Sequence, residues 1–224
     1  MDVRVVGVDV GSVALGRFAW AAVDAPRLSL VAQGSDPGTA AEALAGALAR
    51  GGRAALVLEA PGCVPVPAAD RADGWRDLGR ARAGEGNRPW SAGAGAGVLA
   101  TGVAQAAWLL ARLAAIAPGT AATTVPHRWS AAHGPRLLLA EALVSGAGKP
   151  VPTAAGPHAA DAEAAARALA ERLPALPDLR TDVSCAPHRP FNLLAAAAAW
   201  AGLEVPAEEL HGDLLVVRAR PAGT

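Results

Sequence analysis

The sequence that decides the fold of this chain is VVGVDVGS, at residues 5–12. It is an apolar, β-branched run that carries one carboxylate, Asp9, and it predicts a buried strand over residues 3–10. A carboxylate in a buried strand is unfavourable unless a metal ion, a phosphate or a proton compensates its charge. We therefore take Asp9 as a candidate functional residue. The alternative is that Asp9 caps a turn at Gly11 and Ser12.

The composition is that of a soluble, globular protein. The 224 residues are 52% hydrophobic and 18% charged, which suits one domain with a well-formed core. The 20 basic and 20 acidic residues balance, which argues against a protein that coats nucleic acid through bulk electrostatics. Lys149 is the only lysine and alanine is abundant. We attribute part of this bias to a GC-rich genome and do not use the alanine runs as evidence of function.

The sequence shows no pattern of a secretion signal or a membrane span. The amino terminus, MDVRVVGVDV, lacks a basic segment followed by a long apolar one. The longest apolar segment, residues 98–116, is interrupted by Gln105 and Arg112, which favours a buried or amphipathic helix. Cys63 and Cys185 have neither metal-ligand nor redox spacing. We expect a cytoplasmic protein with reduced thiols and no membrane partner.

The order of the predicted elements indicates an α/β fold. Strands over residues 3–10, 17–23 and 28–34 follow one another at hairpin distances and predict an antiparallel meander. Helices and strands then alternate, which predicts a mixed five-stranded sheet flanked by helices. The expected elements after the meander are a helix over 39–50, a strand over 54–59, a helix over 93–117, a strand over 136–146 and a helix over 158–173.

Two parts of the chain lie outside this alternation. Residues 61–90 are polar and broken by prolines, and we expect a loop or short helix over the end of the sheet. Residues 174–224 form a C-terminal extension with an additional helix at 191–203 and an additional strand at 214–220. We expect a single domain over residues 1–224, with its core at 3–173.

Three carboxylates are the ones least explained by solvation. Asp9 lies on the first strand, Glu59 ends the fourth, and Asp161 lies on a late helix, one turn after His158. Adjacent strands can bring such groups together, and clustered carboxylates repel one another unless a hard cation such as Mg²⁺ or Mn²⁺ binds them. Two such ions, about 3.5 to 4 Å apart, activate water and stabilise the leaving oxygen in phosphodiester hydrolysis. We therefore expect a magnesium or manganese site.

These residues also carry a family resemblance. The element order, the carboxylates of GVDVGS and LVLEAPG, and the H-x-x-D of HAADAEAAARAL resemble the ribonuclease H-like superfamily, most closely its RuvC-like branch. The proline-rich turn after Glu59 also resembles an uncharacterised bacterial family described as predicted ribonuclease H-like nucleases. The resemblance covers residues 3–173. It implies a ribonuclease H-like nuclease acting on nucleic acid, metal ligands at Asp9, Glu59 and Asp161, and a role for His158 in orienting or activating water.

Simpler interpretations of the same residues stay open. Glu59 alone is also explained as a solvated strand end. His158 and Asp161 are also explained as the first turn of an exposed helix, where an acidic residue favours the dipole. Glu141, on the strand at 136–146, faces either the site or solvent, and we keep it as a secondary candidate metal ligand.

The candidate substrate-binding residues are Ser12, beside Asp9, and three residues of EGNRPW: Asn87, Arg88 and Trp90. The glycine-rich SAGAGAG that follows suits a backbone-amide cradle for a phosphate, or is only a flexible entry to the long helix. The arginines and tryptophans of this region suit contacts with a nucleic-acid backbone and stacking on bases. Acidic residues among them also predict a solvated, self-paired surface.

Two other functions are compatible with the sequence. GVDVGS also resembles the first phosphate-binding turn of actin-like ATPases and sugar kinases, which implies that Asp9 coordinates magnesium-ATP. Those proteins pair two similar domains, and a chain of 224 residues leaves little room for a second one. The other alternative is a noncatalytic ribonuclease H-like scaffold, because a fold does not fix an activity.

Overall fold

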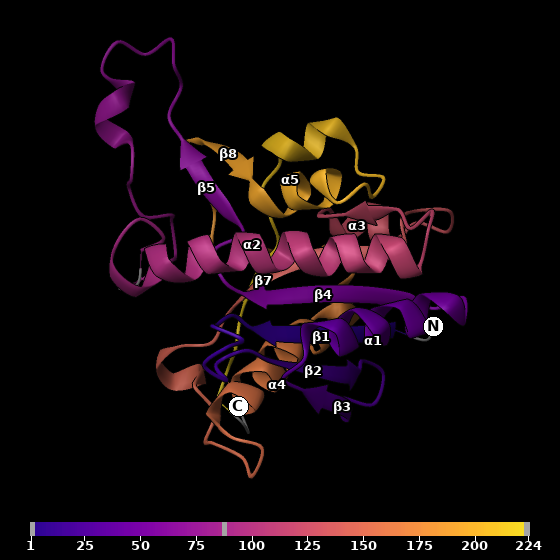
Figure 1. Cartoon of the computed structure of the whole chain (residues 1–224). Coiled ribbons are helices and arrows are strands. Elements are labelled where there is room, and N and C mark those ends of the chain that lie inside the picture. The colour runs from indigo at the N-terminus through magenta and orange to yellow at the C-terminus, as the bar shows by residue number, and fades with distance from the viewer. Residues whose placement is uncertain (1–2, 87–88, 222–224) are drawn as a thin grey trace.

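The computed structural model describes residues 3–86 and 89–221, and it is built on a mixed sheet of mostly parallel strands (Figure 1). The strands in spatial order are β3 (Ser29–Gly34), β2 (Ala19–Asp24), β1 (Val3–Asp9), β4 (Arg53–Glu59), β7 (Leu137–Leu143) and β6 (Ala122–Thr123), and β9 (Val216–Arg218) also pairs with β7. The pairs β1–β2 and β2–β3 are antiparallel, and the other pairs are parallel. The expected α/β class with a mixed sheet is confirmed.

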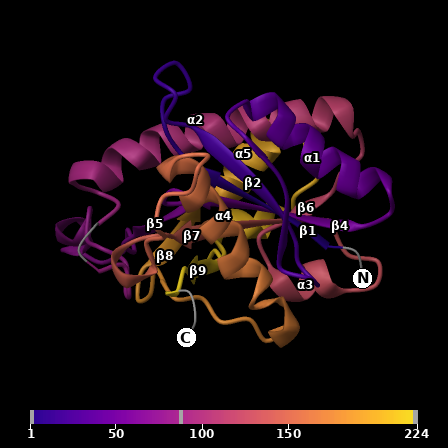
Figure 2. The ribbon, with the colours of Figure 1, turned by 90° about the horizontal axis from the view of Figure 1, so that it is seen from below.

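Helices cover both faces of this sheet. They are α1 (Pro37–Ala49), α2 (Gly93–Ile116), α3 (Pro126–Ser130), α4 (Pro157–Ala170) and α5 (Leu193–Trp200), with 3-10 turns η1 (Gly74–Asp77), η2 (Gly146–Gly148), η3 (Leu173–Ala175) and η4 (Ala207–His211). Helices α1, α2 and α5 lie on one face, and α4 lies on the other (Figure 1, Figure 2).

The expectation of five sheet strands was too low. The described residues place seven strands in the main sheet, because β6 and β9 both pair with the outer edge of β7. Strand β6 has only two residues, which is too short to show a period. Strands β5 (Cys63–Val66) and β8 (Arg189–Asn192) form a second, two-stranded sheet. We expected a loop or short helix at β5, and β8 overlaps the first two residues of the helix expected over 191–203. Each contains a proline, Pro65 or Pro190, which weakens a strand pattern.

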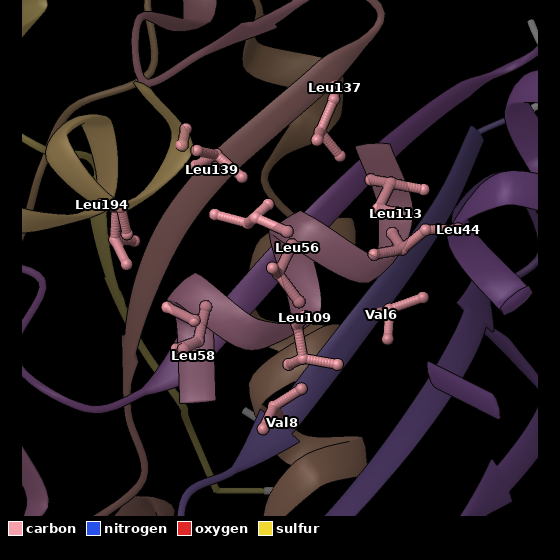
Figure 3. Packing of buried hydrophobic residues seen from close by; sticks show 14 of the residues in the cluster. Val6, Val8, Leu44, Leu56, Leu58, Leu109, Leu113, Leu137, Leu139 and Leu194 are labelled. Carbon is pink, nitrogen blue, oxygen red and sulfur yellow. The ribbon is translucent and has the colours of Figure 1, made fainter. Parts of the chain in front are cut away.

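The alternation of side chains along the strands divides the core into two layers. Val6, Val8, Leu56 and Leu58 point toward α1 and α2, where they pack with leucines such as Leu109 (Figure 3). The intervening residues of β1 and β4 point the other way, and those toward the middle of the strands pack under α4. The face that a strand residue occupies therefore depends on its parity, that is, on whether it is an even or an odd number of positions from a residue of known face. This parity decides which carboxylates can meet.

The C-terminal residues contribute to the same core. Strand β9 extends the edge of the sheet beside β7. Leu194 and Ala198 of α5 belong to the apolar cluster that contains the inner face of α2. The segment that we expected to be an extension thus supplies a strand of the sheet and part of its helical cover.

Helix α2 is the one helix among the described residues whose length and hydropathy suit a membrane span. Its most apolar window has a mean hydropathy of 1.5. Its buried residues, including Gly102, Ala106 and Leu110, pack on the sheet and on the neighbouring helices. This arrangement is consistent with a soluble protein in which α2 covers a core.

Candidate metal centre

The pairing of β1 with β4 places two carboxylates side by side. The strands are parallel and in register from Val3 opposite Arg53 to Asp9 opposite Glu59. Paired residues of adjacent strands project to the same face of a sheet. Asp9 and Glu59 have the parity of the residues under α4, so both carboxylates lie at the end of the strands on that face.

Helix α4 approaches this face closely because β1 has a glycine. A Cβ atom on Gly7 would lie 2.1 Å from the carbonyl oxygen of Ala162 and 2.7 Å from the amide nitrogen of Ala166. Any larger residue at position 7 would therefore push the helix away from the sheet. The alanines of α4 complete this close packing, and the contact carries Asp161, at the start of the helix, to the ends of β1 and β4.

The result is a compact cluster of three carboxylates. Asp9, Glu59 and Asp161 each offer an oxygen, and these oxygens all lie within 4.8 Å of one another. For comparison with this limit of 4.8 Å, two oxygens on opposite sides of one Mg²⁺ ion lie about 4.2 Å apart, twice the metal–oxygen distance of about 2.1 Å. Glu59 Oε2 is buried and has no hydrogen-bond partner among the described residues. A cation is the group that this donor set fits, because it would satisfy the unpartnered oxygen and offset the repulsion.

The burial of the cluster changes its protonation. Burial raises the pKa of Glu59 to about 9, with further contributions from the negative charges of Asp9 and Asp161. Burial also raises the pKa of Asp9, although the hydrogen bond from His158 partly offsets this. Glu59 therefore holds a proton at neutral pH unless another cation replaces it.

Two basic side chains lie at the rim of the cluster. The Nδ1 atom of His158 lies 2.6 Å from Oδ2 of Asp9, and the imidazole is 41% exposed. The ammonium group of Lys149 forms an ion pair with Oδ2 of Asp161. Burial lowers the pKa of Lys149, but Asp161, followed by Glu59, more than offsets this and raises it above its usual range.

The cluster opens into a cavity of about 210 Å³. Its polar lining consists of the three carboxylates, Lys149 and His158, together with Glu85 and Ser145. Its other lining residues are mostly apolar and come from α2, the turn after β4 and the end of β7, and include Val98, Ala60 and Val144. The carboxylates are thus open to a small group that enters from solvent, and the apolar wall limits how much water accompanies it.

Comparison with known proteins adds no family to this geometry. No family model, curated protein or solved structure matches this chain. The ribonuclease H-like resemblance stays a prediction from the sequence, and the arrangement of the side chains carries the functional assignment.

Glu141 is not part of the cluster, and its assignment as a secondary metal ligand is corrected. On β7 it pairs with Leu58 rather than with Glu59, so it projects to the opposite face of the sheet. There it is completely buried and forms a two-armed ion pair with Arg82, with both nitrogen–oxygen distances at 2.7 Å. The backbone N–H of Gly62 donates a third hydrogen bond to it.

Of the four candidate substrate-binding residues, the two that the structure describes, Ser12 and Trp90, lie outside the cavity lining. The hydroxyl of Ser12 accepts a hydrogen bond from the backbone N–H of Leu15, within its own turn. The indole N–H of Trp90 donates to the carbonyl of Arg80, and neither Ser12 nor Trp90 lines the cavity. Asn87 and Arg88 lie outside the described residues.

The structure also brings together residues that sequence spacing does not connect. Arg82 joins Glu85 as well as Glu141, in a buried group reached only by folding of the broken segment. Cys63 and Cys185 are free and buried, and their sulfur atoms lie 3.6 Å apart although 122 positions separate them. Lys149 lies at the site but was not among the predicted site residues. The sequence signal that could have found it is that it is the single lysine among 20 basic residues.

Proposed function

We propose that Asp9, Glu59 and Asp161 bind one or two Mg²⁺ or Mn²⁺ ions and that the protein is a nuclease that hydrolyses phosphodiester bonds. The observation that carries this proposal is the convergence of three carboxylate oxygens within 4.8 Å, one of them on a residue with a buried, unpartnered oxygen. The donor set consists of carboxylate oxygens, which favours hard cations over zinc or copper.

A divalent ion at such a site supplies an activated water and stabilises negative charge on the phosphate. The residues of the chain have separate tasks around it. Glu59 offers the oxygen that lacks a partner, and Asp9 is held in place by His158. His158, at the exposed rim, would orient or activate the attacking water.

We propose that the substrate is a nucleic acid. The observation that supports this choice is the surface of the segment between β5 and α2. This segment projects from the body of the molecule (Figure 1). Trp75 on η1 is 66% exposed, and the guanidinium of Arg76 lies 5.4 Å from its ring centre. Exposed aromatic rings stack on bases. Arg71 and Arg80 are paired with Asp77, so the charge of this surface is largely balanced.

Two matched substitutions on α4 test the proposal. Asp161→Asn is expected to lower cleavage more than about 100-fold, because even the partners that orient metal ligands typically contribute 10- to 100-fold. Glu163→Gln lies two residues further on, in an ion pair with Arg167, and is expected to keep wild-type activity. Cleavage of DNA, RNA and branched substrates in Mn²⁺ is the measurement.

Equal cleavage by both variants would contradict the proposal, since it would place the activity elsewhere or in a contaminant. Titration calorimetry with magnesium-ATP supplies the second contrast. Binding of the nucleotide, together with no cleavage of any nucleic acid, would favour the phosphate-binding alternative.

A further inference from the structure

Lys149 is unusual both in the sequence and in the structure. The chain has 20 basic residues, and Lys149 is the only lysine among them. The structure places it in the wall of the cavity, with its ammonium on Asp161. The other 19 of these 20 basic residues are arginines, and the single lysine lies where the carboxylates meet.

The chemistry of lysine suits this position better than that of arginine. An ammonium is a compact point charge with three rotatable donors, whereas guanidinium is a wide planar fork that prefers two-armed pairing with one carboxylate. Arg82 shows the second behaviour at Glu141. A compact cation can sit beside Asp161 without filling the space between the three carboxylates.

The backbone of Lys149 is fixed, while its side chain reaches the rim. The residue follows η2, and its N–H donates to the carbonyl of Gly146. A Cβ atom on Gly148 would lie 2.1 Å from the carbonyl oxygen of Ala219, so this turn packs directly on the segment after β9. The Lys149 side chain is 50% exposed, which leaves it room to move toward solvent.

We propose that Lys149 is a resident cation of the carboxylate cluster that becomes a phosphate-binding residue when a metal ion binds. This inference rests on the metal site proposed above. Before metal binding, the ammonium neutralises Asp161. A divalent ion on the same carboxylate repels the ammonium, whose fixed backbone and exposed side chain leave the mouth of the cavity as the open direction. There Lys149 meets the phosphate of the substrate.

Amine labelling tests the first half of this proposal directly, because the chain offers only one lysine amine. Acylation with an amine-reactive ester, read by peptide mass spectrometry, separates Lys149 from the amino terminus. We expect saturating Mn²⁺ to raise the rate at Lys149 several-fold while the rate at the amino terminus stays constant. We expect Asp161→Asn to raise the acylation rate at Lys149 in the absence of metal. A Lys149 rate that is unchanged by saturating Mn²⁺ would overturn the proposal.

Calorimetry with Mn²⁺ separates this inference from the metal site itself. Lys149→Met removes a competing like charge and is expected to tighten Mn²⁺ binding about tenfold, as for one pKa unit of interaction. Arg112→Met, a similarly exposed cation on α2, is expected to leave the affinity unchanged. Binding to the wild type with equal or weaker affinity in Lys149→Met would overturn the role of Lys149 and leave the metal site standing. No binding to either protein would overturn both.

Kinetics test the second half. At saturating Mn²⁺, Lys149→Met is expected to raise the KM for a nucleic-acid substrate about tenfold, because one charge-assisted phosphate contact is lost. Lys149→Arg is expected to recover part of that loss, since it keeps the charge. An unchanged KM in Lys149→Met would overturn the phosphate-binding role.

Discussion

Two groups of buried acidic side chains lie near the same end of the sheet, and Glu85 of one group lines the cavity into which the other opens. The chain treats the two groups differently. On the face covered by α2, Glu85 and Glu141 share one arginine, Arg82. On the face covered by α4, Asp9, Glu59 and Asp161 converge within 4.8 Å. Both groups are expensive to bury. Only the first has its compensating charge at the centre.

The hydrogen bonds show the contrast atom by atom. Every carboxylate oxygen of Glu85 and Glu141 accepts at least one hydrogen bond, from Arg82 or from a backbone N–H. In the other group, Glu59 Oε2 is buried without a partner in the described part of the chain, and the basic side chains of Lys149 and His158 are at the rim. A buried group that is fully satisfied is structural. A buried acceptor without a partner needs an explanation, and at Glu59 the two neighbouring carboxylates favour a bound cation.

Removal of Arg82 is expected to have the largest effect on stability. Arg82→Met leaves two buried carboxylates without their cation, which costs about 3–5 kcal/mol for a broken buried pair. Arg27→Met, on an exposed arginine paired with Asp24, is the control and is expected to leave the denaturation midpoint unchanged. Urea denaturation measures both. A loss of stability in Arg82→Met no larger than in Arg27→Met would contradict the compensation of Glu85 and Glu141 by Arg82.

Metal ions are expected to stabilise the protein through the other group alone. At a Mn²⁺ concentration 100 times the Kd, the free energy of unfolding should rise by about 2.7 kcal/mol. Asp161→Asn should abolish this gain. Glu141→Gln should lower the stability of the metal-free protein but keep the gain from Mn²⁺. Thermal unfolding with and without a chelator is the measurement. A gain that survives in Asp161→Asn would place the metal elsewhere.

A third expected effect is on the pH dependence of the metal-free protein. Burial raises the pKa of Glu59 from its ordinary value of 4.5 to about 9. The stability linked to this group is therefore fully present below about pH 4.5 and is lost as the pH rises through about 9, by on the order of 1 kcal/mol per pH unit. Glu59→Gln should remove this slope. Parallel slopes for both proteins between pH 5 and 8 would contradict the burial of an uncompensated Glu59.

The contrast between the groups also explains what the sequence could predict. Asp9 and Glu59 stand out because each is a lone carboxylate on an apolar strand, and His158 and Asp161 because they share a helix face near a strand end. Such signals are local. The α/β class and the three-stranded meander follow from equally local patterns of period and turns.

The remaining features depend on pairings that no local pattern contains. The sequence left the face of Glu141 open, because the register of β7 against β4, which sets Glu141 beside Leu58, is decided by tertiary packing. Arg82 lies 59 residues from its partner Glu141. Strand β6 is too short to have a period, and β5 and β8 contain prolines that resemble loop signals.

The most direct test of the metal site is anomalous diffraction from crystals soaked in Mn²⁺. The predicted result is a manganese peak about 2.1 Å from oxygens of Asp9, Glu59 and Asp161, with the ammonium of Lys149 displaced from Asp161. The pair of Glu85 and Glu141 should stay free of manganese, because Arg82 and backbone N–H groups already occupy their carboxylate oxygens. A well-soaked crystal with no peak between the three carboxylates, or with a peak at Glu141 instead, would contradict the account.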